Sequence, residues 1–113
     1  MKIMTELATF HFPPDFDERA EFEMTPRGYL AGGQIELADG RRFPVTFYDP
    51  VRLAQDVESC VESGVPMLAE PGLVVIPEVT REVLLRTIPE LVRERFFDHL
   101  NPKPRAIANG VAH

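Results

Sequence analysis

The spacing of apolar side chains along the chain changes from two residues to about 3.6 residues at Asp49-Pro50. Before this point Phe43, Val45 and Phe47 alternate with other side chains, which is typical of a strand with one buried face. After it, apolar side chains recur at helical spacing. We therefore predict a strand that is followed directly by a helix over about residues 50–63. The apolar stripe of this helix, which we expect to face the sheet, is Leu53, Ala54, Val57, Cys60 and Val61.

Local signals at both ends support this helix. Asp49 is a favourable N-cap residue, because its carboxylate can accept a hydrogen bond from a free backbone N–H of the first turn. Pro50 suits the first helical position, where it loses no hydrogen bond. Gly64 suits the residue after the helix, which is commonly left-handed.

The preceding strand forms a hairpin whose register follows from matching its faces. A two-residue turn at Asp39-Gly40 would set polar side chains opposite apolar ones, whereas a three-residue turn, 38–40, sets like against like. We therefore predict strands over 29–37 and 41–48 joined by that turn, with Gly40 left-handed. The predicted pairs are Leu37 with Arg41, Ile35 with Phe43, Gly33 with Val45, Ala31 with Phe47 and Leu30 with Tyr48.

Two further strands are predicted upstream of this hairpin. In residues 20–24 the apolar and acidic side chains alternate, and Thr25-Pro26-Arg27-Gly28 has the composition of a tight turn, so 20–24 is predicted as the first strand of a meander. Residues 2–12 alternate weakly up to Pro13-Pro14 and are predicted as a strand, with a helix over residues 4–10 left open. Gly32-Gly33 indicates a bend, a bulge or a close approach in mid-strand, with a shallow ligand site as the sharper alternative.

Downstream of the helix, residues 73–76 form an apolar run between Gly72 and Pro77, which is typical of a strand covered on both faces. We expect this strand to be central and parallel to 41–48, because a helix connects the two. Thr80 can cap a last helix over 80–100, kinked or broken at Pro89. Asn101-Pro102 ends it, and residues 101–113 are expected to form a tail.

These elements predict a single α+β domain over residues 1–100. It has two layers: a mostly antiparallel sheet of four or five strands, and the helices 50–63 and 80–100 on one face. The strands are the meander 20–24, 29–37 and 41–48, the strand 73–76 and the segment 2–12.

Composition fits one soluble domain and disfavours several classes of partner. The chain has 113 residues, 44% of them hydrophobic, and a formal net charge of -6. Residues 1–78 carry fourteen acidic and six basic side chains, and phosphate recognition needs the opposite balance, so nucleic acid and anionic membranes are not expected. Cys60 is the only cysteine, and the start of the chain lacks the apolar run of a signal peptide, so we expect a reducing, cytoplasmic location.

Motifs for catalysis, metals or cofactors are not found in the sequence. Cys60 lies in a helical apolar stripe and is best explained as a core residue. The three histidines, His11, His99 and His113, are far apart and have no ligand spacing. The glycines match no phosphate-binding loop. We therefore predict no catalytic residue, no metal site and no cofactor.

Four residues are candidates for binding a ligand or a partner. Tyr48, Asp49 and Arg52 follow one another where a strand ends and a connecting helix begins, a place that often holds ligands in open α/β sheets. The alternative is that Asp49 only caps the helix, Arg52 only pairs with a neighbouring carboxylate and Tyr48 only covers Leu30. Phe97 lies off the apolar stripe of the last helix, so it either widens the core face or protrudes as an interface anchor.

The leading functional hypothesis is therefore a small, acidic, non-enzymatic interaction module that binds another protein or itself. One version is an inhibitor or immunity-type protein that uses the acidic residues 15–23 against a basic partner. A homodimer through a sheet edge or the last helix is a further version. The rival class is a small enzyme or ligand sensor that uses the corner of Tyr48, Asp49 and Arg52.

Overall fold

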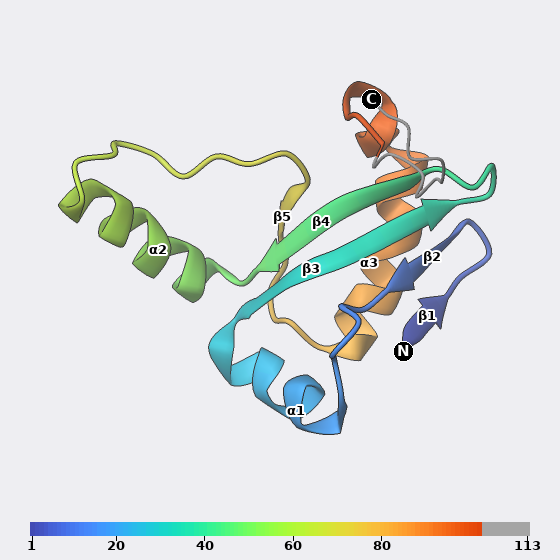
Figure 1. Ribbon diagram of the computed structural model, residues 1–113, viewed down its shortest axis with the longest axis horizontal. Coiled ribbons are helices and arrows are strands. Elements are labelled where there is room, and N and C mark those ends of the chain that lie inside the picture. The colour runs from blue at the N-terminus through green and yellow to red at the C-terminus, as the bar shows by residue number, and fades with distance from the viewer. Residues whose placement is uncertain (103–113) are drawn as a thin grey trace.

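The computed structural model of the protein describes residues 1–102 and has one five-stranded sheet with an α+β architecture. Figure 1 shows the sheet with its helices. The strands lie in the order of the chain: β1 (Lys2–Met4), β2 (Ala8–His11), β3 (Tyr29–Leu37), β4 (Arg42–Tyr48) and β5 (Leu73–Val75). The helices are α1 (Glu18–Arg27), α2 (Pro50–Glu62), α3 (Arg81–Arg93) and the short 3₁₀ helix η1 (Phe96–His99). The predicted fold class, a mostly antiparallel sheet with helices, is confirmed.

The first segment is a hairpin of two short strands rather than one strand over 2–12. β1 and β2 pair antiparallel, with Ile3 opposite Phe10. The side chain of Thr5 closes the turn, since its Oγ1 donates to the carbonyl oxygen of Ala8 at 2.8 Å. The helix left open for residues 4–10 is not present.

The predicted strand 20–24 is wrong, because these residues belong to α1. Asp17 caps this helix by accepting from the N–H of Ala20 at 2.9 Å, and Gly28 ends it in a left-handed conformation with φ of 65°. Glu23 forms ion pairs with Arg19 and Arg27, each four residues away. Both caps and these pairs favour a helix over an alternation only five residues long.

The predicted register of β3 and β4 is confirmed in the half of the hairpin that lies next to the turn. Ile35 pairs with Phe43, Gly33 with Val45, and the N–H of Leu37 donates to the carbonyl oxygen of Arg41 at 2.9 Å. Gly40 is left-handed, with φ of 90°, as the three-residue turn requires.

The other half of this hairpin differs from the prediction by one residue. A bulge between Leu30 and Gly33 shifts the register, so that Leu30 pairs with Phe47 and Tyr29 with Tyr48. Gly32 takes φ of 84° at the bulge. Gly33 lies against Phe10, since an added Cβ would be 2.4 Å from its ring. The glycine pair therefore marks a bulge and a close approach from the neighbouring strand.

The strand β5 is parallel to β4, as predicted, but it lies at the edge of the sheet and not near its centre. It has three residues, and Val75 is 44% exposed. Within the apolar run, Ile76 is buried and Leu73 and Val74 are half-buried, so the run is covered only in part. Sequence alone does not separate this case from a central strand.

The last helical region breaks after Pro89 rather than at it. Thr80 caps α3 as predicted, accepting from the N–H of Val83 at 3.2 Å. Pro89 lies inside α3, which runs on to Arg93. Arg95 is left-handed, with φ of 60°, and turns the chain into η1. The predicted tail 101–113 lies outside the described residues except for Asn101 and Pro102, which have no regular structure.

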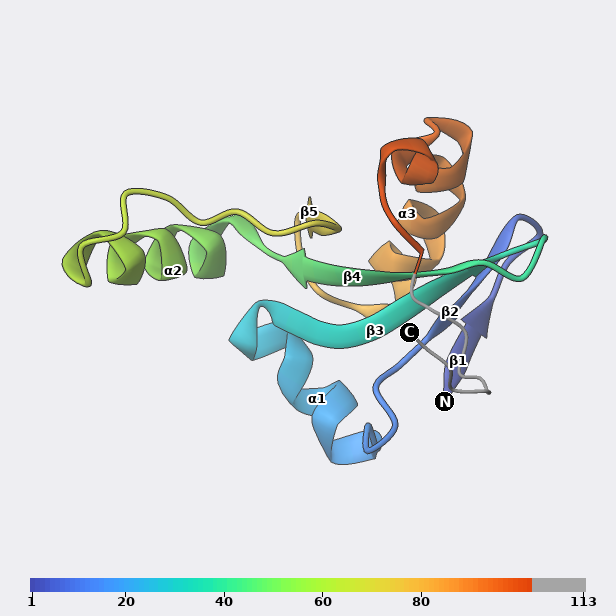
Figure 2. The same ribbon diagram turned by 45° about the horizontal axis from the view of Figure 1, so that its top comes forward.

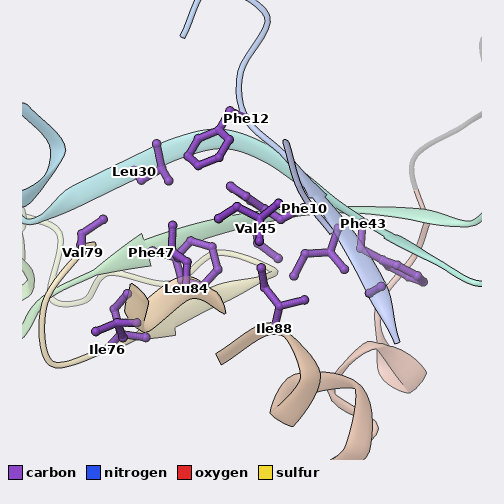
Figure 3. Packing of buried hydrophobic residues seen from close by; sticks show 14 of the residues in the cluster. Phe10, Phe12, Leu30, Phe43, Val45, Phe47, Ile76, Val79, Leu84 and Ile88 are labelled. Carbon is purple, nitrogen blue, oxygen red and sulfur yellow. The ribbon is translucent and has the colours of Figure 1, made fainter. Parts of the chain in front are cut away.

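The core lies between one face of the sheet and α3. Figure 3 shows Leu84 and Ile88 of α3 against Val45 and Phe47 of the sheet. All four are almost fully buried. In Figure 2 most of α3 lies above the strands and α1 lies below them, and the two helices meet at the start of α3, where Arg81 donates to Glu21. The predicted inward face of β4, Phe43, Val45 and Phe47, is confirmed as the centre of this core.

The helix α2 does not pack on the sheet. It continues from the end of β4 away from the other elements, and residues 63–72 return alongside it to β5 (Figure 1). None of its residues is buried, including Cys60, which was expected in the core. The radius of gyration of the Cα atoms is 15.0 Å, against about 13 Å for a compact domain of about 100 residues. We call residues 50–72 the arm.

Candidate functional site

The predicted corner is built where β4 ends and α2 begins. Asp49 caps α2, because its Oδ1 accepts from the N–H of Arg52 at 2.7 Å. Its own N–H donates to the carbonyl oxygen of Gly28 at 2.9 Å. Gly28 leaves the space that the Asp49 carboxylate fills, since an added Cβ would lie 2.4 Å from Oδ2. The end of α1 and the start of α2 are therefore joined at this residue.

Arg52 makes its contacts within the same joint. Its Nε donates to Asp56 Oδ1 at 3.0 Å, and one terminal nitrogen donates to the carbonyl oxygen of Arg27 at 3.2 Å. The guanidinium lies over the ring of Tyr29, 4.7 Å from the centroid. This stacking holds the root of the arm against β3.

Tyr48 is buried, at 3% exposure, with its ring 4.9 Å from that of Tyr29. Burial, together with the nearby Asp56 carboxylate, raises the pKa of Tyr48 well above its ordinary value of 10.0. The phenol therefore stays protonated near neutral pH and cannot act as a base there.

The structure thus brings Tyr48, Asp49 and Arg52 together, and the contacts described use them to join three elements. This matches the structural alternative for these residues, except that Tyr48 faces Tyr29 instead of Leu30. Binding of a ligand at this corner stays a prediction.

Phe97 is separate from the corner and lies in the core. It is 3% exposed, with its ring 5.0 Å from Phe43 and 5.2 Å from Phe96. Phe97 thus widens the core face and does not protrude from the surface. A partner could not contact this ring without opening the core.

The acidic segment 15–23 is largely part of α1, and two of its carboxylates are paired. Arg81 donates to both oxygens of Glu21, at 2.9 and 2.7 Å, while Glu23 pairs with Arg19 and Arg27. Phe22 stands between them and is 81% exposed. The negative charge of this surface is thus lower than the count of its acidic residues indicates.

The arm presents a surface that the sequence did not identify as a site. Val51, Val61 and Met67 are 67%, 56% and 62% exposed, and Val65 is 47% exposed. Two signals were present: Val51 lies outside the predicted stripe, and the connection from Ser63 to Gly72 is long for a compact domain. Val51 and Val61 lie on α2, and Val65 and Met67 lie on the segment that returns from it, so the arm exposes apolar side chains along both of its parts.

A second apolar surface lies between β5 and α3. A groove with a volume of about 480 Å³ runs between the segment Val74–Pro77 and the side of α3. Val75, Val83 and Leu91 give it apolar walls, and Arg86 is at its middle.

Residues 1–102 contain neither a metal-binding cluster nor a membrane-spanning helix. This part of the chain contains no group of three or more His, Cys, Asp and Glu side chains that could hold a metal ion. Among the same residues, no helix has the length and apolar character needed to cross a membrane.

Comparison with known protein families, with curated proteins and with solved structures finds no match to this chain.

Proposed function

We propose that the protein is a non-enzymatic association module that binds another protein chain through the arm. The observation that carries this proposal is that α2 is an amphipathic helix without a single buried residue. In the apolar stripe of α2, Leu53, Val57 and Cys60 are only half-buried and Val61 is 56% exposed, so the helix gains little from its own domain. An isolated helix of 13 residues is marginal in water. Docking of the stripe into a groove of a partner supplies the missing burial.

The joint at Asp49 supports this function because it fixes the direction of the arm. The cap, the Arg52 contact with Arg27 and the stacking on Tyr29 hold the first turn of α2 to the domain. A helix held at its root and free along its length loses less conformational freedom on binding than a flexible segment does.

Site-specific photo-crosslinking tests the proposal. A benzophenone side chain at Val61, on the arm, is expected to give a covalent protein adduct. The same group at Asp39, in the exposed β3–β4 turn, is the matched control and is expected to give none. Equal adduct formation at the two positions, or none at Val61, would contradict a binding role for the arm.

A second candidate is an inhibitor of a basic protein, acting through α1. The observation that favours it is Phe22, an aromatic side chain 81% exposed on an acidic helix. The pairing of Glu21 and Glu23 leaves Asp15, Asp17 and Glu18 for attraction to a basic surface. Binding by this route should weaken strongly between low and high salt and should be lost in Phe22→Ala.

A further inference from the structure

The exposed side of α2 from Val51 to Val61 and the groove between β5 and α3 are similar in length. Val51 and Val61 are ten residues apart on α2, which corresponds to about 15 Å along a helix. Val83 and Glu94, which bound the groove along α3, are eleven residues apart, or about 16 Å. The groove and the exposed side of α2 therefore match in length.

The two surfaces also carry opposite charges at their centres. Val51, Ala54, Glu58 and Val61 follow one another at spacings of three, four and three residues and are all exposed, so Glu58 lies on the same exposed side of α2 as Val51 and Val61. Arg86 lies on the groove wall between Val83 and Glu90. Neither Glu58 nor Arg86 has an ion-pair partner among residues 1–102.

The two carboxylates that line the groove, Glu90 and Glu94, do not neutralise Arg86. Glu90 is paired with Arg93 at 2.8 Å. Glu94 is eight residues from Arg86, about 12 Å along the helix, at the end of the groove. Arg86 is thus the cation nearest the middle of an apolar channel.

The arm cannot occupy the groove of its own domain in the observed arrangement. Asp49 and Arg52 fix the start of α2 to the end of β4 and the end of α1, and α2 runs from there away from α3 (Figures 1 and 2). A second copy carries both surfaces and has no such constraint. Reciprocal docking of two arms into two grooves closes a symmetric pair and leaves no open surface for further copies.

We propose that the partner of the arm is a second copy of this chain, whose β5–α3 groove receives α2, with Glu58 of one protomer paired to Arg86 of the other. This inference rests on the proposed function, because it names the partner of the same surface. The apolar contacts supply affinity, and the single charge pair fixes the register of α2 in the groove.

Charge exchange tests this partner and this register. Sedimentation velocity on the purified full chain is expected to show a dimer. Glu58→Arg and Arg86→Glu should each weaken the dimer by about tenfold or more, because each places two like charges together. In an equimolar mixture of the two variants, the heterodimer has opposite charges at both contacts, the exchanged pair at one and the native pair at the other, so it should recover the lost affinity. The double variant should recover it as well, with the exchanged pair at both contacts.

A matched control separates this pair from a general charge effect. Glu62→Arg changes the same charge on the next turn of α2 and should leave the dimer affinity within about threefold of wild type. Both Glu58 and Arg86 are exposed, so the variants are expected to keep the wild-type circular dichroism spectrum and melting behaviour as monomers.

The outcomes distinguish this inference from the proposed function. A wild-type chain that is monomeric at all soluble concentrations overturns the second copy as partner, while an adduct at Val61 with a different protein would still support the arm as a binding surface. A dimer that is insensitive to Arg86→Glu overturns the groove as docking site. Absence of both a dimer and any Val61 adduct contradicts the inference and the proposed function together.

Discussion

The contribution of a single side chain to stability follows from how deeply it is buried. Phe97 and Phe22 are the clearest contrast, at 3% and 81% exposure. Phe97→Ala is expected to lower the free energy of unfolding by about 3 to 5 kcal/mol, because it leaves a cavity beside Phe43. Phe22→Ala, the control, should stay within about 0.5 kcal/mol of wild type. Urea denaturation measures both, and similar effects of the two substitutions would contradict the assignment of Phe97 to the core.

Gly28 provides a second test at this scale. An alanine there meets a left-handed backbone, with φ of 65°, and the Asp49 carboxylate at the root of the arm. Gly28→Ala should cost about 2 to 5 kcal/mol from the two effects together. Gly40→Ala meets a positive φ with no neighbouring atom within 4 Å, and should cost about 1 to 2 kcal/mol. If the two variants were equally stable, the close contact with Asp49 would not hold in solution.

The ion pair of Glu21 and Arg81 gives stability a dependence on pH. Hydrogen bonds from Arg81 hold the pKa of Glu21 below its ordinary value of 4.5. A carboxyl group whose pKa is depressed on folding adds stability above its unfolded value, so this contribution is lost as pH falls below 4.5. The urea midpoint of Glu21→Gln should therefore decrease less than that of wild type over this range. Glu18→Gln, on the same helix and without an ion pair in the described residues, should keep the wild-type slope.

The helix α2 differs from α3 in how far its side chains are buried. Its residues are at most half-buried, whereas α3 buries Val83, Leu84 and Ile88. Amide hydrogen exchange in dilute, monomeric protein should therefore be faster in α2 than in α3, since α2 can open without disrupting the core. Mass spectrometry of peptides from the two helices measures the difference. Equal protection of both helices in the monomer would show that α2 is packed in solution.

Elements were predictable where two local signals agreed. The turn at Gly40 followed from face matching together with a glycine, and α2 from the Asp49 cap together with a helical stripe. The strand prediction for residues 20–24 was wrong because Ala20 and Met24, four residues apart, also share one side of a helix, while Phe22 points to solvent. The caps at Asp17 and Gly28 decide in favour of the helix.

The surroundings of an element were not predictable from its pattern. The apolar stripe shows which side of α2 is apolar, but it does not show which element covers that side. For the same reason, the apolar run of β5 predicted a central strand, whereas β5 lies at the edge of the sheet. At the corner, the sequence named the residues and the cap. The stacking of Arg52 on Tyr29 and the approach of Gly28 to Asp49 join segments more than twenty residues apart, which no local pattern encodes.

At the scale of the whole molecule, reciprocal docking of the arms links stability to concentration. A dimer that dissociates on unfolding should melt about 3 °C higher for each tenfold rise in protein concentration. Arg86→Glu should move this dependence to protein concentrations about tenfold or more higher, while keeping the melting temperature of the dilute wild-type protein. Differential scanning fluorimetry over a dilution series measures it, and a melting temperature that is independent of concentration in wild type would argue against the dimer.

The order of the strands has a consequence for how the chain folds. Each strand of the sheet neighbours the one before it in the sequence, so during synthesis every new strand emerges next to a partner that is already made. The elements that cover the sheet, α3 and then η1, follow the last strand. Until Leu84 and Ile88 leave the ribosome, the aromatic face of Phe10, Phe43 and Phe47 has nothing over it. The growing chain should therefore bind a chaperone that recognises apolar surface. This binding should end once the elements that cover the aromatic face are complete.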